Sequence, residues 1–142
     1  MPTLDAEKEV SDALVQWIEK EHLPLEIRCP SSDTIRLGTN LVRSPDILIA
    51  NKETGKTLGI EIKAGLRELP IGIYPVLKEM QEQFHKTNGD FIVLSTAPLS
   101  GALSSSVTEA GIPFFEIRKP SDVIDVLTPR LKALADEPAD SR

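Results

Sequence analysis

The chain has 142 residues, of which 40% are hydrophobic and 27% charged, and its net charge at pH 7 is −6. This composition predicts one compact domain over residues 1–136, followed by a polar tail over residues 137–142. The chain has no apolar run of about 18 residues and no signal-peptide core, so we expect a cytoplasmic protein with no transmembrane helix. Cys29 is the only cysteine, so we expect no internal disulfide and no cysteine zinc cluster.

In chain order, the first predicted element is an amphipathic helix over residues 4–21, with Val10, Leu14 and Ile18 on one apolar stripe. Residues 38–44 are interpreted as a connection. Short β-rich runs predict strands over residues 25–28, 34–37, 47–50 and 58–62, the last two joined by a polar turn.

The second half of the chain alternates helices and strands. The pattern predicts a helix over 71–87, a buried strand over 91–95, a helix over 98–110, a strand over 112–117 and a helix over 120–135. An antiparallel meander followed by a βαβ crossover predicts an α/β fold, in which helices flank a mixed central sheet.

Charged residues in the predicted hairpin indicate chemistry. Because side chains alternate along a strand, Glu61 and Lys63 share one face of the second strand. If the turn is a four-residue loop, Asn51 pairs with Lys56 and Asp46 lies opposite Glu61. A three-residue loop would shift the register by one residue and separate the two carboxylates.

Opposed carboxylates repel each other, and a divalent cation removes that penalty. Mg²⁺ prefers oxygen ligands and uses one or two carboxylates. Asp46 and Glu61 would supply these, and the Ile62 carbonyl could add a third oxygen. Lys63 would orient an attacking water or neutralise charge that develops on a phosphate. The alternative is a solvated hairpin with ordinary surface charges.

The arrangement of these residues resembles a known motif. Pro45-Asp46, fourteen intervening residues and then Glu61-Ile62-Lys63 resemble the motif of the PD-(D/E)xK nuclease superfamily. That superfamily includes restriction endonucleases, archaeal Holliday-junction resolvases and RecB-type nucleases.

The resemblance extends over residues 5–119, and residues 110–116 resemble the late strand of Mrr-like and resolvase-like members. It implies a restriction endonuclease-like αβββαβ core. It also implies a Mg²⁺-dependent DNA endonuclease in which Mn²⁺ can substitute for Mg²⁺.

The resemblance further implies an acidic residue on the first helix. Glu7 lies three residues before Val10, beside the apolar stripe, whereas Glu9 points about 160° away from Glu7. We therefore favour Glu7 as a third acidic metal ligand and catalytic residue, and rank Glu21 lower. The alternative for Glu7 is a first-turn acid that is favoured by the helix dipole.

Some related nucleases carry a glutamine on the helix that follows the second motif strand. Gln81 and Gln83 both flank the apolar stripe of this helix, so periodicity does not choose between them. A solvated position is the alternative for each. The Gln-x-x-x-Tyr pattern of the RecB branch is absent.

The negative net charge opposes DNA binding, which depends on neutralising phosphates with Lys and Arg. Basic residues near the predicted site are nevertheless available: Arg28, Arg36, Arg43, Lys52, Lys56 and Lys63. We expect a DNA-cutting homodimer with no membrane association, with RNA as an alternative substrate and a partner protein as another source of DNA affinity. The alternative function is a catalytically inactive, nucleic-acid-binding or accessory subunit of the same fold.

Overall fold

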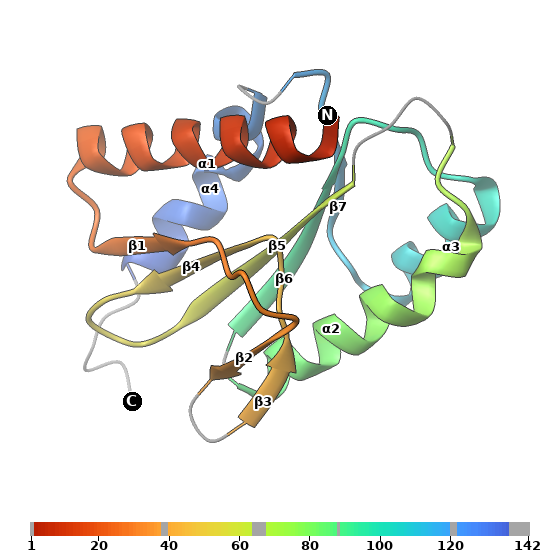
Figure 1. Ribbon diagram of the computed structural model, residues 1–142, viewed down its shortest axis with the longest axis horizontal. Helices are drawn as coiled ribbons and strands as arrows, with labels where there is room; N and C mark the ends of the chain where they lie inside the picture. The colour runs from red at the N-terminus through yellow and green to blue at the C-terminus, as the bar shows by residue number, and fades with distance from the viewer. Residues whose placement is uncertain (1, 38–39, 64–67, 88, 120–121, 137–142) are drawn as a thin grey trace.

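The computed structural model describes residues 2–37, 40–63, 68–87, 89–119 and 122–136, which form a layered α/β fold (Figure 1). The tail predicted over residues 137–142 lies outside the described residues. The central sheet has five strands in the order β1-β4-β5-β6-β7. Their bounds are Leu25–Arg28 (β1), Ile47–Asn51 (β4), Thr57–Lys63 (β5), Gly89–Ser95 (β6) and Phe114–Glu116 (β7).

The sheet is mixed. Strands β1, β4 and β5 are antiparallel, whereas β5, β6 and β7 are parallel. Helices lie on both faces of the sheet (Figure 1). They are α1 (Pro2–Glu21), α2 (Tyr74–Lys86), α3 (Gly101–Ala110) and α4 (Val123–Asp136), and a 3₁₀ turn η1 (Ile71–Ile73) precedes α2. The predicted α/β architecture is confirmed, and α1-β1-β4-β5-α2-β6 contains the expected αβββαβ order.

Strand β5 lies between two hydrophobic cores, one on each face of the sheet. Ile60 and Ile62 belong to the core under α1 and α4, together with Val10 and Leu127. On the opposite face, α2 packs so closely that a Cβ on Gly59 would lie 2.5 Å from Cζ of Phe84. Because side chains alternate along a strand, the residues two and four positions after Gly59 also lie on the α2 face.

A two-stranded hairpin departs from the prediction. Strands β2 (Thr34–Leu37) and β3 (Asn40–Arg43) form a sheet of their own, so the interpretation of residues 38–44 as a plain connection was wrong. Strand β2 is not part of the central sheet, in which β1 pairs directly with β4. The hairpin lies against α2 instead, where the Arg43 backbone N–H donates to Gln83 Oε1 at 2.9 Å.

Several element boundaries also differ from the sequence pattern. The helix predicted over 71–87 is divided into η1 and α2, with a proline in the first turn of α2. The helix predicted from residue 98 begins at Gly101, because Ser100 Oγ caps it by accepting from the Leu103 N–H at 3.1 Å. The start predicted at Pro120 lies outside the described residues. None of the described helices is long and apolar enough to cross a membrane.

Candidate metal centre

The turn between β4 and β5 sets the register of the candidate site. The Asn51 N–H donates to the Lys56 carbonyl and the Gly55 N–H donates to the Asn51 carbonyl, both at 2.9 Å. Ladder pairs run from Ala50–Thr57 to Ile47–Ile60. One further step places Asp46 opposite Glu61, so the register predicted from a four-residue loop is correct.

Side-chain hydrogen bonds of Asn51 explain why this turn forms. Asn51 Oδ1 accepts from the N–H groups of Glu53 at 2.7 Å and Thr54 at 3.1 Å, while Nδ2 donates to the Leu134 carbonyl at 2.7 Å. Gly55 has φ 78°, the left-handed conformation that glycine adopts most readily. These contacts fix the loop length, which in turn fixes the residue opposite Glu61.

The Asp46 carboxylate is attached to the end of β5 by a backbone hydrogen bond. Its Oδ2 accepts from the Ile62 N–H at 2.7 Å. The Lys63 carbonyl accepts from the Thr96 N–H at 3.0 Å, which directs the backbone groups of Lys63 towards β6. Because successive strand residues direct their backbone groups to opposite sides, the Ile62 carbonyl points away from β6, to the side of Asp46.

The two charged side chains at the end of β5 form an ion pair. Lys63 Nζ lies 3.3 Å from Glu61 Oε2, and the two side chains are 29% and 15% exposed. Burial raises the pKa of the Glu61 carboxyl and the negative charge of Asp46 raises it further, while Lys63 acts in the opposite direction. The lysine therefore compensates only part of the cost of holding the Glu61 carboxylate ionised here.

The structure brings together two of the three predicted carboxylates. Glu7 belongs to α1, but its side chain lies outside the described residues, so its role as a ligand stays a prediction. Glu9 is exposed. Among the residues that are described, no group of three or more His, Cys, Asp or Glu side chains is arranged to hold a metal ion. Asp46, Glu61 and the Ile62 carbonyl thus make up the described part of the centre.

Helix α1 packs on the other face of the sheet from Glu61. Val10 and Leu14 pack in the core that includes Ile60 and Ile62, on the face opposite to Glu61. The N-terminal end of α1 lies towards the end of the sheet where β5 finishes (Figure 1). Helix α1 therefore covers the face of β5 that does not carry Glu61.

Both glutamines of α2 have structural partners. Gln81 is buried, and its Nε2 donates to the Gly111 carbonyl at the end of α3 at 2.9 Å. Gln83 Oε1 accepts the β3 backbone N–H described above. The solvated interpretation is therefore wrong for Gln81, and these bonds tie the two side chains to α3 and β3.

Sequence reasoning did not single out Ser44. In the described part of the chain, Ser44 Oγ and Thr57 Oγ1 are the buried side-chain oxygens that have no hydrogen-bond partner. Ser44 stands two residues before Asp46, and its backbone N–H donates to the Asp33 carbonyl at 2.9 Å. The only sequence signal was its position in the run Ser44-Pro45-Asp46.

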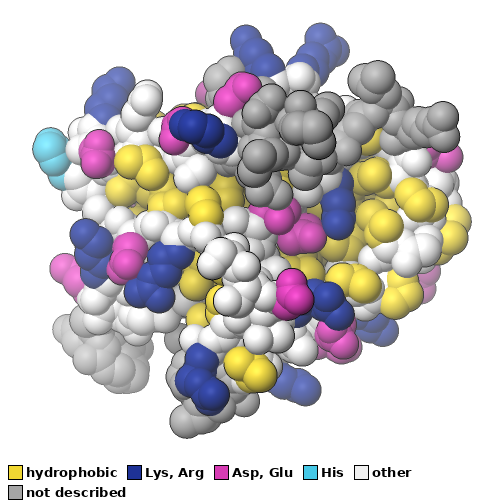
Figure 2. Space-filling view, viewed as in Figure 1, with side chains coloured by type: hydrophobic (Ala, Val, Ile, Leu, Met, Phe, Trp, Pro, Cys, Tyr) yellow, Lys and Arg dark blue, Asp and Glu magenta, His cyan; other side chains and the backbone are white. Residues whose placement is uncertain are grey.

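The surface around the centre carries charges of both signs. Figure 2 shows acidic side chains near the middle of this face with a basic side chain beside them, and the remaining Lys and Arg are dispersed among Asp and Glu. Besides Lys63, two of the predicted basic residues form ion pairs, Arg28 with Glu26 at 3.0 Å and Arg43 with Glu79 at 3.4 Å. The described part of this face therefore has no continuous basic surface.

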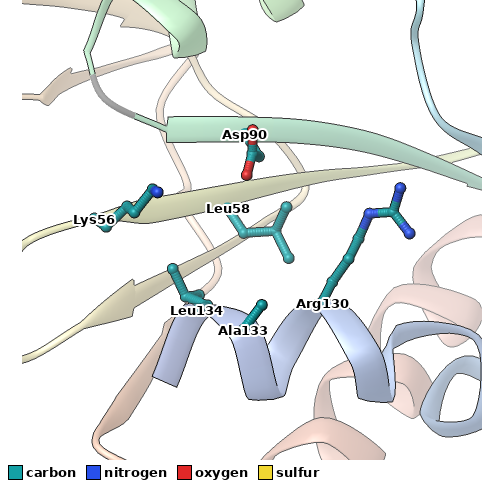
Figure 3. A pocket seen from close by; sticks show the side chains of 6 residues that line it. All are labelled: Lys56, Leu58, Asp90, Arg130, Ala133 and Leu134. Atoms are coloured by element: carbon teal, nitrogen blue, oxygen red, sulfur yellow. The ribbon is translucent and has the colours of Figure 1, made fainter. Parts of the chain in front are cut away.

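A separate cavity of about 100 Å³ lies elsewhere in the fold (Figure 3). Leu58 at the start of β5, Asp90 at the start of β6 and Arg130 of α4 line it. The Arg130 guanidinium lies 4.9 Å from the centre of the Phe115 ring. Leu58 faces α4 at the opposite end of β5 from Glu61, so this cavity is distinct from the candidate metal centre.

No protein-family model and no curated protein matches the sequence. Two solved structures are similar to the fold. Protein VC1899 from Vibrio cholerae has a TM-score of 0.61 and 15% identity over 91% of this chain, which spans 34% of that chain. AF1548, a protein of unknown function, has a TM-score of 0.54 and 11% identity over 86% of this chain, which spans 66% of that chain. At such identities the likeness shows the α/β fold alone.

Proposed function

We propose that the protein is a Mg²⁺-dependent DNA endonuclease of the PD-(D/E)xK type, which hydrolyses phosphodiester bonds in the cytoplasm and acts as a homodimer. The observation that carries this proposal is the juxtaposition of Asp46 with Glu61 and Ile62 at the end of β5, with Lys63 Nζ 3.3 Å from Glu61. The motif spacing of the nuclease superfamily supports the same reading.

The donor set fits a hard divalent cation. Asp46, Glu61 and the Ile62 carbonyl offer only oxygen atoms, which suit Mg²⁺ and Mn²⁺. Asp46 stands opposite Glu61, and its negative charge raises the electrostatic cost of ionising Glu61. These residues would hold the cation, and Glu7 is proposed as a further ligand.

A divalent cation at this position would supply Lewis acidity and lower the pKa of a bound water. The chain's own residues have separate tasks. The hydrogen bond from the Ile62 N–H orients the Asp46 carboxylate. The ion pair with Glu61 keeps the Lys63 ammonium at the centre, where it can orient a water molecule and neutralise charge that develops on the phosphate.

One observation favours a second candidate function. The net charge is −6, and Arg28 and Arg43 are already paired with acidic side chains. Weak attraction to phosphate gives low nucleic-acid affinity. This suits an accessory subunit of the same fold that does not cut nucleic acid and binds it with the help of a partner protein.

Cleavage assays separate these functions. Plasmid, linear duplex, single-stranded and four-way-junction DNA, and an RNA hairpin, would be incubated with Mg²⁺, Mn²⁺ or EDTA. We expect metal-dependent cutting that falls by at least about 100-fold in Asp46→Asn and Lys63→Ala. Lys132→Ala, an exposed lysine on α4, is the matched control and should cut like wild type.

The outcomes have distinct meanings. Binding of DNA without cutting by a folded wild-type protein would favour the accessory subunit. Cutting that survives in both Asp46→Asn and Lys63→Ala would contradict the proposed centre. A folded protein that neither binds nor cuts any of these substrates would exclude both functions.

A further inference from the structure

Strand β1 is an edge strand of the central sheet, next to β4 only. The Lys52 N–H donates to the Pro24 carbonyl at 2.9 Å, and the ladder continues with the pair Glu26–Ala50. Because backbone groups alternate between the two sides of a strand, those of Leu25 and Ile27 point away from β4. No described strand of this chain pairs with that edge, so it can accept another strand.

A groove of about 280 Å³ lies between α1 and β1, and the charged residues Glu19 and Lys52 line it together with apolar side chains. Val15 and Ile18 of α1 line one side, and Leu25 and Ile27 of β1 line the other. Val15 is 37% exposed although it is apolar. Figure 2 shows hydrophobic side chains gathered between the positions of α1 and β1, with charged side chains around them. An open strand edge beside a groove with exposed apolar side chains is suited to strand addition.

We propose that this surface binds a second copy of the same chain, through antiparallel pairing of the two β1 strands about a two-fold axis at Ile27. In this arrangement Ile27 lies opposite Ile27 of the partner subunit, and the apolar side chains of both copies enter the groove. Glu26 then lies opposite Arg28 of the partner subunit. The interface deepens the proposal that the protein acts as a homodimer, and its test by oligomeric state does not require nuclease activity.

The charge pattern of β1 selects this register. Residues whose backbone groups point outward must oppose each other, so the possible registers differ from one another by steps of two residues. Moving one step in one direction places Glu26 opposite Glu26 of the partner subunit. Moving one step in the other direction places Arg28 opposite Arg28 of the partner subunit. Both alternatives oppose like charges, so only the pairing centred on Ile27 is self-complementary.

The charged and the apolar residues have different roles in this interface. Glu26 and Arg28 form an exposed ion pair within one chain, with side chains 44% and 59% exposed. Exposed ion pairs contribute little affinity, so we assign them the choice of register. Backbone hydrogen bonds and burial of Val15 and Ile27, which are at least partly exposed in the single chain, would supply the binding energy.

Light scattering coupled to size-exclusion chromatography tests the interface on the full chain. Wild type should elute as a dimer at about 100 µM and dissociate on dilution. That concentration is at the upper end of the Kd range of weak homodimers, about 1–100 µM. Val15→Glu should weaken the dimer by at least about 10-fold, because it places a charge in the groove. Val76→Glu on α2 is the matched control, since Val76 is 39% exposed outside the groove.

A monomeric wild type at that concentration would overturn the proposal, as would a dimer that Val76→Glu weakens as much as Val15→Glu. A disulfide experiment tests the register in a Cys29→Ser background. Glu26→Cys and Arg28→Cys should cross-link when the two variants are mixed, and neither should cross-link alone, because only unlike positions face each other. Cross-linking of either variant by itself would overturn the proposed pairing.

Discussion

A divalent cation should stabilise this fold, and Glu61→Gln should abolish that stabilisation. The Glu61 side chain is only 15% exposed and lies at the end of β5 opposite Asp46. A cation that binds the folded state, and not the unfolded chain, raises the free energy of unfolding by mass action. The size of the effect therefore reports whether the two carboxylates bind a metal together.

Without metal, the pKa of Glu61 determines whether Glu61→Gln raises or lowers the free energy of unfolding. Burial and Asp46 raise this pKa in the folded state above its ordinary value of 4.5. The folded protein then holds the proton more tightly than the unfolded chain, so stability falls as pH rises from about 4.5 through the folded pKa. In EDTA at pH 7.5, Glu61→Gln should be more stable than wild type, and the difference should shrink towards pH 4.

The ligand set gives the expected size of the stabilisation by a divalent cation. Two carboxylates and a carbonyl make a weak site, for which a Kd of about 1 mM is reasonable. At ten times this concentration the stabilisation is about 1.4 kcal/mol. For a domain of this size the unfolding midpoint should rise by roughly 3–6 °C in wild type. Glu61→Gln should show a rise of less than about 1 °C.

Thermal unfolding followed by circular dichroism, with Mg²⁺ or with EDTA, measures both effects. Glu82→Gln is the matched control, because Glu82 is an exposed acid on α2. An equal cation-dependent shift in Glu61→Gln and wild type would refute the reasoning about the carboxylate pair. A Glu61→Gln protein that is less stable than wild type in EDTA would refute the reasoning about its pKa.

Two further predictions concern the scaffold of the site. Gly59→Ala should lower the free energy of unfolding by about 1–3 kcal/mol, because its Cβ would lie 2.5 Å from Cζ of the buried Phe84; Gly101→Ala, whose Cβ meets nothing within 4 Å, is the control in urea unfolding, and equal stabilities would contradict this packing. Asn51→Ala should cost about 1–3 kcal/mol, because it leaves the Leu134 carbonyl without its 2.7 Å partner, and an unchanged melting temperature would disprove this role.

The register of the β4–β5 hairpin was predictable for a given turn length, because it then depends on local features. Asn51 and Gly55 stand at the ends of a short polar turn, and a four-residue loop brings Asp46 opposite Glu61 by counting alone. Alternation of side chains then places Lys63 on the face that carries Glu61. The turn length, which the sequence left open between three and four residues, depends in part on the hydrogen bond from Asn51 Nδ2 to the distant Leu134 carbonyl.

The mispredicted hairpin shows where local reasoning ends. Residues 34–37 have the composition of a strand, and they form one. Their sequence does not reveal that they pair with Asn40–Arg43 and lie against α2, while β1 pairs with β4. Gln81 is a similar case, since its partner at Gly111 lies on another helix.

The sequence by itself determined the order of the helices and of the central-sheet strands and the faces of β5, and it limited the partner of Asp46 to the registers of a three- or four-residue turn. These features follow from the period of side chains along a strand and from turn length, which are properties of neighbouring residues. Only the tertiary structure decided that β1 is an open edge, that Glu61 is nearly buried and that the Ile62 carbonyl points to the side of Asp46. Each depends on which distant surface is buried against which, because the burial of apolar area selects among pairings that are locally equivalent.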